Sequence, residues 1–293
     1  MLADSLFEKI GYTSEMIEAY TEYKKILSNR LEGLAELTIT NNINLYEACK
    51  IARQFEPNIS EYTMDLMFIL ECTGYLHKKY LENGLSDKMF YDAMIDIRCK
   101  TAECLKFKNV FGTFVTEWFN DFFNLKRLAF GRLQYDVTNH DGDTIKIGDF
   151  SVEEGDLVLR CHIPSSGPLT PELCLDSYKK AHKYFNDRLK NRVLIIRCGS
   201  YLLLPEYKDI FKECSPNIYK FIDNFKLFDV GYSDKFNDSW RIFNVNYDGI
   251  EPEKLQCKTK LQKGFKQHIC NGGAFGSASG ILLFDGEYIL TKN

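Results

Sequence analysis

Apolar residues recur at helical spacing over the first 124 residues of the chain. A clear example is the stretch "TSEMIEAYTEYKKIL", which Thr13 is placed to cap and whose apolar face consists of Met16, Ile17, Tyr20, Tyr23 and Leu27. Further helices are predicted from Ser86 onward and over residues 60–84, where Gly84 is a suitable helix end. The pattern therefore predicts an all-helical domain over residues 1–125, with its many Phe and Tyr side chains in the core.

Strand-like alternation replaces the helical pattern at about residue 126. The apolar residues Leu133, Tyr135 and Val137 occupy every second position, as they do in a half-buried strand, and residues 141–150 follow as a hairpin. Two short apolar strands are predicted over residues 156–163 and 192–198, with an amphipathic helix between them. A helical crossover of this kind makes its two strands parallel if they share a sheet.

The remaining segments complete a second domain over residues 126–293. A helix over residues 205–225 is expected to break at Pro216, and the glycine-rich stretch "NGGAFGSASG" is interpreted as a flexible or closely packed connection that begins at a helix end, Gly272 or Gly273. The other expected elements are strands over residues 226–233, 238–247 and 280–290 and a helix over 252–270. The predicted fold is an all-helical domain followed by a mixed-sheet domain with flanking helices, α+β or α/β in class.

Charge and hydropathy narrow the possible partners. The net charge is −4 and basic residues are dispersed, which argues against nucleic acid as a partner. The amino terminus does not resemble a signal peptide, and the most apolar segment is interrupted by Asp65 and Glu71 and is too short to cross a bilayer. We expect a soluble cytoplasmic protein that does not bind a membrane.

The ten cysteines do not form a metal-binding pattern. No Cys-x-x-Cys pair occurs, and the five-residue spacing of Cys99 and Cys104 would not place two thiolates on one helix face. The acidic loop over residues 139–150 has Thr144 and Phe150 where a calcium loop needs glycine and glutamate. Reduced thiols and no bound metal are therefore expected.

The turn "PSSGPLTP", residues 164–171, raises a choice between two interpretations. The hydroxyls of Ser165, Ser166 and Thr170 and the backbone amides near Gly167 could hold an anion at the start of the following helix. Alternatively, Thr170 is an ordinary helix cap, and Glu172 in the first turn would repel an anion. Both interpretations stay open at this point.

Three stretches of the sequence resemble a bacterial family of acyltransferases. They are "CHIPSSGPLTPELCLDSYKKAHKYF", "RCGSYLLLPEYKDIFKECSPNIYKFIDNFKL" and "NGGAFGSASG". The family has a helical amino-terminal domain and a carboxy-terminal domain similar to GNAT-type N-acetyltransferases, in which acyl-CoA lies between two splayed parallel strands. The chain departs from the usual GNAT glycine pattern, since "PSSGPLTP" replaces it.

The resemblance implies roles for particular residues. His162 and Cys198 would lie at the carboxyl ends of neighbouring parallel strands, and His162 would act as the base for an incoming amine. Tyr207, or Tyr201 as the alternative, would protonate the departing CoA thiolate. The residues Ser165, Ser166, Gly167, Thr170 and Cys198 would bind acyl-CoA or acetyl-CoA. The alternatives are a structural strand-end histidine, an inert buried thiol and packed tyrosines.

The predicted function is transfer of an acyl group from CoA to a small-molecule amine by direct attack, without a metal. The competing prediction is a catalytically inactive GNAT-like binding or regulatory module, which the missing glycine pattern favours. The sequence specifies neither the acyl chain, the acceptor nor the oligomeric state.

Overall fold

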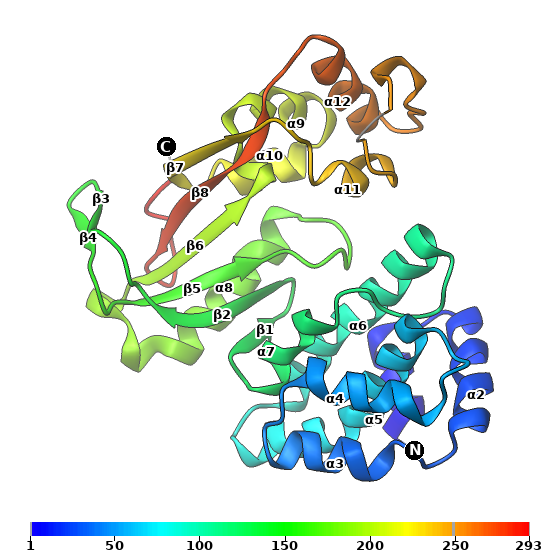
Figure 1. The fold of residues 1–293 in the computed structure, drawn as a ribbon. Helices are drawn as coiled ribbons and strands as arrows, with labels where there is room; N and C mark the ends of the chain where they lie inside the picture. Colours follow the sequence, from blue (N-terminus) through cyan, green and yellow to red (C-terminus); the bar gives the residue numbers. More distant parts are fainter. Residues whose placement is uncertain (1, 248–249, 293) are drawn as a thin grey trace. The chain divides into compact units, whose positions relative to one another are not determined.

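The computed structural model describes residues 2–247 and 250–292, and its contacts group into two compact units (Figure 1). One unit comprises Met1–Gln134 together with Pro164–Ser166. The other comprises Tyr135–Ile163 and Gly167–Asn293.

The first unit is helical, as the apolar spacing predicts. Thr13 and Ser86 cap their helices by accepting hydrogen bonds from Met16 N and Met89 N, both at 3.3 Å, and Gly84 follows its helix with a φ of 73°. No helix in the described part of the chain is long and apolar enough to cross a membrane. The α-helices (α) and 3₁₀ helices (η) of the first unit are α1 Leu2–Ile10, α2 Ser14–Leu27, α3 Glu32–Thr40, α4 Leu45–Ala52, η1 Arg53–Phe55, α5 Glu61–Glu82, α6 Asp87–Lys108, η2 Thr116–Phe119 and α7 Asn120–Phe123.

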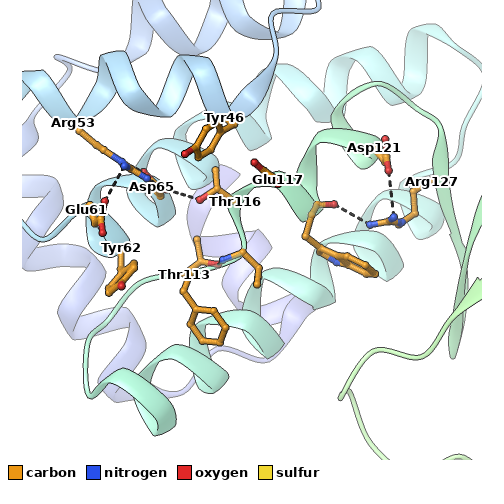
Figure 2. A pocket seen from close by; sticks show the side chains of 13 residues that line it. Tyr46, Arg53, Glu61, Tyr62, Asp65, Thr113, Thr116, Glu117, Asp121 and Arg127 are labelled. Atoms are coloured by element: carbon orange, nitrogen blue, oxygen red, sulfur yellow. Dashed lines mark hydrogen bonds and ion pairs between the residues drawn. The ribbon is translucent and has the colours of Figure 1, made fainter. Parts of the chain in front are cut away.

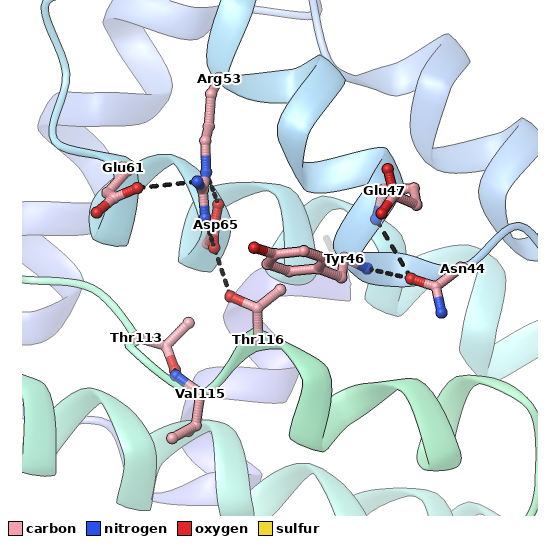
Figure 3. A network of polar contacts seen from close by, with 9 residues as sticks. All are labelled: Asn44, Tyr46, Glu47, Arg53, Glu61, Asp65, Thr113, Val115 and Thr116. Atoms are coloured by element: carbon pink, nitrogen blue, oxygen red, sulfur yellow. Dashed lines mark hydrogen bonds and ion pairs between the residues drawn. The ribbon is translucent and has the colours of Figure 1, made fainter.

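An ion pair between a buried carboxylate and a half-buried arginine joins the start of α5 to the segments on either side of it (Figure 3). Arg53 donates from Nε to Asp65 Oδ1 at 2.8 Å and from Nη2 to Asp65 Oδ2 at 2.7 Å, and the Thr116 hydroxyl donates to the same carboxylate. Asp65 is only 1% exposed, so these donors replace the water that it would otherwise bind. Asp65 therefore holds η1, α5 and η2 together.

The loop before η2 lies directly against the first turn of α5. The Thr63 hydroxyl donates to Phe111 O at 2.7 Å, and Thr113 N donates to Tyr62 O at 3.0 Å. A Cβ on Gly112 would lie 2.5 Å from the carbonyl carbon of Tyr62. The contact leaves no space for a side chain at residue 112, so the loop and helix must separate to admit one.

We expect Gly112→Ala to lower the free energy of unfolding by about 2 kcal/mol, a usual penalty for forcing an extra carbon into a packed site. Urea unfolding of the whole protein would measure it. Gly33→Ala is the matched control, because a Cβ there meets nothing within 4 Å and Gly33 lies inside α3. That control should be neutral or stabilising by up to about 1 kcal/mol, and equal losses in the two variants would contradict the packing argument.

The second half of the chain forms a six-stranded mixed sheet (Figure 1), in the order β1-β2-β5-β6-β8-β7, and a separate β3-β4 hairpin. The strands are β1 Arg127–Phe130, β2 Leu133–Asn139, β3 Ile145–Ile147, β4 Phe150–Val152, β5 Leu157–His162, β6 Leu194–Ser200, β7 Lys226–Ser233 and β8 Phe275–Phe284. The longer helices are α8 Pro171–Phe185, α9 Lys208–Cys214, α10 Pro216–Ile222, α11 Ser239–Phe243 and α12 Lys260–Cys270. Short 3₁₀ turns lie at η3 Asn186–Arg188, η4 Lys190–Arg192, η5 Tyr201–Leu203, η6 Pro205–Tyr207 and η7 Pro252–Lys254.

The predicted parallel pair at the centre of this sheet is confirmed. Strands β5 and β6 pair in parallel, and α8 is the crossover between them. The sequence predicts a buried apolar stripe of Cys174, Tyr178, Ala181, Phe185 and Leu189 for this helix. The first four are buried, but α8 ends at Phe185, and Leu189 lies beyond it and is only half-buried. The expected helix break at Pro216 is also present, since α9 ends at Cys214 and α10 begins at Pro216.

The prediction of a strand over residues 238–247 is wrong, because Ser239–Phe243 is the short helix α11. Ile242 and Phe243 are both buried, which a strand with one buried face does not allow for adjacent residues. Asn244 ends the helix with a φ of 62°, and Gln262 Nε2 donates to Ile242 O at 2.9 Å. Gln262 belongs to α12, about 20 residues further along the chain, so the local sequence pattern could not predict this bond.

The interpretation of the glycine-rich stretch is only partly right. Gly272 follows the end of α12 with a φ of 70°, as expected, but residues 275–280 belong to strand β8 and are not a flexible stretch. Partner strands on both sides, β6 and β7, supply its backbone hydrogen bonds. A Cβ on Gly276 would lie 2.1 Å from Gly231 O, and one on Gly280 would lie 2.9 Å from the Phe225 Cβ. The small residues thus permit close packing within the sheet.

Two further boundaries differ from the sequence prediction. The helix expected over residues 252–270 begins later than predicted: residues 252–254 form the short turn η7, coil follows, and the helix α12 starts at Lys260. Thr259 and Gln262 form a capping box that starts α12, because the Thr259 hydroxyl and the Gln262 amide each bond the other's backbone. The last strand ends at Phe284, six residues before the predicted end, and only an isolated bridge joins Phe284 to Ile289.

Candidate functional site

The candidate site begins at the carboxyl ends of the two parallel strands β5 and β6, where their pairing stops. Their register pairs Leu159 with Ile196 and Arg160 with Arg197, and among the described residues it extends no further. Over Cys198–Ser200, β6 stays in register with β8 on its other side. The carboxyl ends of parallel strands are the usual ligand-binding edge of such sheets.

His162 lies at this edge and is held by a carboxylate from the neighbouring strand β2. Its Nε2 is 2.7 Å from Asp136 Oδ2, and the two side chains are 27% and 23% exposed. When Nε2–H donates to the carboxylate, Nδ1 carries the lone pair and can accept a proton. Asp136 also stabilises the imidazolium that this transfer would form.

Sequence reasoning missed Asp136. The only signal was a charged residue in a strand whose apolar residues, Leu133, Tyr135 and Val137, point to the other face. That signal cannot identify His162 as the partner, because the pairing depends on how β2 and β5 neighbour each other in the sheet.

The turn after β5 uses several of its polar groups within the protein. The Ser165 hydroxyl donates to Glu103 Oε1 at 2.6 Å, and Ser165 and Ser166 group with the helical unit. Gly167 has a φ of 138°, a conformation that favours glycine. These observations explain the local sequence without requiring an anion.

Thr170 is the cap of α8, as the structural interpretation of the turn predicts. Its hydroxyl accepts a hydrogen bond from Leu173 N at 3.4 Å, and Pro171 occupies the first turn of the helix. Hydrogen bonds from the backbone of Glu172 and from Thr170 lower the pKa of the Glu172 carboxyl. The carboxylate of Glu172 therefore already places a negative charge at the start of α8, which disfavours a bound anion there. Any anion bound by this turn would have to contact the backbone amides that precede the helix.

The two candidate acids lie in an aromatic cluster. The Tyr207 ring contacts those of Phe236 and Phe265, with centroid distances of 6.0 and 4.8 Å, and the Tyr201 ring also contacts Phe236. Burial raises the pKa of both tyrosines well above the usual value, so each keeps its proton at neutral pH. The Tyr207 hydroxyl is buried and makes no hydrogen bond of good geometry to a described residue.

The thiol of Cys198 lies on β6, opposite Gly280 of β8, and is only 1% exposed. Among the described residues, no group of three or more His, Cys, Asp or Glu side chains is arranged to hold a metal ion.

Comparison with known families identifies both halves of the chain. The N-acyltransferase N-terminal domain matches residues 1–125, and the GNAT-like C-terminal domain matches residues 128–282. The chain belongs to the GNAT-like N-acyltransferases. The family resemblance and the fold class that the sequence predicts are thereby confirmed, whereas a search of curated proteins finds no match.

Solved acyltransferases share the fold of this GNAT-like N-acyltransferase. An acyltransferase mutant in complex with octanoyl-CoA is 16% identical, with a TM-score of 0.71 over 96% of this chain and 87% of the other. An acyltransferase in complex with decanoyl-CoA and teicoplanin is 16% identical, with a TM-score of 0.64 over 95% and 98%. A third, in complex with decanoyl-CoA, is 20% identical, with a TM-score of 0.65 over 95% and 86%.

Proposed function

We propose that the protein transfers an acyl group from acyl-CoA to the amine of a small molecule. The observation that carries this proposal is the pair of His162 and Asp136 at the carboxyl end of β5, beside the parallel strand β6. Membership of the N-acyltransferase family supports the reaction class. The acyl-CoA ligands of the structural relatives support acyl-CoA as the donor.

The reaction is a direct displacement. The amine nitrogen attacks the thioester carbonyl carbon, the C–S bond breaks, and the acyl group becomes an amide. His162 Nδ1 accepts the amine proton, directly or through water, while Asp136 holds the ring. Tyr207, or Tyr201 in its place, gives a proton to the departing thiolate; both tyrosines are protonated at neutral pH.

Donor binding is assigned to the end of β5 and the turn that follows. The backbone N–H groups of Ser165, Ser166, Gly167 and Thr170 are the proposed contacts for the CoA pyrophosphate, and Cys198 lines the thioester end. The domain division at residue 125 is part of the same proposal: residues 126–293 carry the acyltransferase site.

A second candidate is a GNAT-like module that binds a ligand without catalysis. The polar groups that the turn already uses favour it, since the Ser165 hydroxyl bonds Glu103 and Thr170 caps α8. Absence of donor binding would favour the second candidate, and turnover of acyl-CoA would exclude it.

We expect saturating decanoyl-CoA to raise the midpoint of thermal unfolding, since a ligand at 100 times its Kd adds about 2.7 kcal/mol to the folded state. The shift should be larger than with CoA, because the acyl chain buries apolar area. ATP, a polyphosphate without a thioester, is the control. If none of these ligands moves the midpoint, the acyltransferase proposal fails and the binding module with another ligand replaces it.

A further inference from the structure

The helical unit contains a pocket of its own (Figure 2). It has a volume of about 650 Å³ and lies among the start of α4, η1, the start of α5, residues 113–118, Asp121 and Arg127. Pockets of this size accommodate small organic molecules. Its lining residues are Tyr46, Arg53, Glu61, Tyr62, Asp65, Thr113, Phe114, Val115, Thr116, Glu117, Trp118, Asp121 and Arg127.

The two arginines in the lining are already committed to protein groups. Arg53 makes two bonds to Asp65 and donates from Nη1 to Glu61 Oε2 at 2.8 Å. Arg127 donates to Trp118 O at 2.9 Å and pairs with Asp121 at 3.3 Å. Neither guanidinium is therefore available as the main partner of an anionic ligand.

The remaining charge in the lining is negative. Four carboxylates, those of Glu61, Asp65, Glu117 and Asp121, face two arginines, so the lining residues themselves carry an excess of two negative charges. The ammonium groups of Lys50 and Lys108, beside the rings of Tyr46 and Tyr62, offset part of it. Glu117 is exposed, and its carboxylate has no hydrogen bond or ion pair with a described residue. A cationic ligand would supply the missing partner.

Aromatic rings form a large part of the wall, and two of them already attract ammonium groups of the protein. Lys50 Nζ lies 4.3 Å from the centroid of the Tyr46 ring, and Lys108 Nζ lies 6.0 Å from that of Tyr62. Ring faces attract cations and also stack with other rings. The combination of rings with carboxylates suits a ligand that has both a flat ring and a separate, positively charged group.

The wall is preorganised. The bonds from Thr63 to Phe111 and from Thr113 to Tyr62, together with the close approach at Gly112, hold residues 111–113 against α5. The hydrogen bond from Thr116 to Asp65 fixes the start of η2 in the same way (Figure 3). A ligand would bind without first having to order these segments.

We propose that this pocket is a second ligand site, which binds the primary ammonium ion of a ring-bearing organic amine. It does not depend on the proposed acyl transfer, because all the lining residues lie within the helical unit.

Calorimetry with tyramine, in the absence of CoA, tests the site. The neutral amide N-acetyltyramine and the anion 3-(4-hydroxyphenyl)propionate have the same ring without the ammonium charge. We expect each to bind at least about 10-fold more weakly than tyramine, because neither pairs with the excess negative charge. Binding of N-acetyltyramine as tight as that of tyramine would overturn the proposal.

Two variants place the binding in this pocket. Glu117→Gln should weaken tyramine binding by about 5-fold, the loss of one partly solvated charge pair, and Tyr62→Leu should weaken it by a similar factor. The control is Glu18→Gln, because Glu18 is an exposed carboxylate on α2 outside the pocket. Tyramine affinity that is unchanged in both pocket variants but lost in His162→Ala would assign the amine to the transfer site and overturn the second site.

Discussion

Replacement of His162 by alanine is expected to lower the rate of acyl transfer by about 10²–10⁴-fold, the usual contribution of a positioned general base. The reason is the geometry at the end of β5, where Asp136 bonds Nε2 of His162 and orients the imidazole that would take the amine proton. Without the imidazole, the amine must lose its proton to water, and the binding of acyl-CoA should change little. Release of the CoA thiol, followed with a thiol reagent and an amine acceptor, measures the rate.

A second histidine–aspartate pair provides the control. His77 Nε2 lies 2.6 Å from Asp87 Oδ1 in the helical unit, nearly the geometry of the proposed catalytic pair. His77→Ala should therefore leave the rate unchanged. Asp136→Asn should lower the rate by about 10-fold or more, because it removes the charge that stabilises the imidazolium while His162 remains. Full turnover in His162→Ala would exclude His162 as the base.

Replacement of Asp65 by alanine is expected to lower the free energy of unfolding by about 3–5 kcal/mol. Asp65 is 1% exposed and accepts two bonds from Arg53 and one from Thr116. Its loss leaves a cavity and leaves the Arg53 guanidinium with only the exposed Glu61 as an ionic partner. Urea unfolding, followed by the helical signal in circular dichroism, would detect the change.

Glu61→Ala is the matched control, because it removes the other carboxylate from the same guanidinium. The Glu61 side chain is 54% exposed, and exposed pairs contribute about 1 kcal/mol or less. A small effect at Glu61 beside a large one at Asp65 would show that burial determines the loss. Similar effects in the two variants would contradict this account.

Asp65 also shows why the sequence could not predict such a role. In the sequence, Asp65 is a charged residue that interrupts the most apolar segment. Local patterning uses it to argue against a membrane-spanning helix, but it does not predict that the carboxylate is buried in a protein core. Its donors come from η1 and η2, which precede and follow α5 in the chain. Only tertiary packing brings these donors to the carboxylate.

The candidate site divides in a similar way. The sequence predicts two neighbouring parallel strands, because the two apolar runs and the helix between them are local features, and the pairing of β5 with β6 confirms it. His162 is the last residue of β5, whereas β6 continues past Cys198 to Ser200. Asp136 was not predicted, since a strand's neighbours in a sheet depend on packing far along the chain. The role of His162 stays a prediction that His162→Ala tests, and the roles of Tyr201 and Tyr207 stay predictions.

The sequence by itself determined the elements whose cause is local. Helical periodicity, the cap at Thr13, the helix start at Ser86 and the break at Pro216 all act within a few residues, and the structure has each of them. Tertiary structure alone decided that residues 275–280 join a strand and that residues 239–243 form a helix. It also decided the partner of His162 and the pocket at the start of α5. The physical reason is that these features depend on hydrogen bonds and packing between segments that meet only in the folded chain.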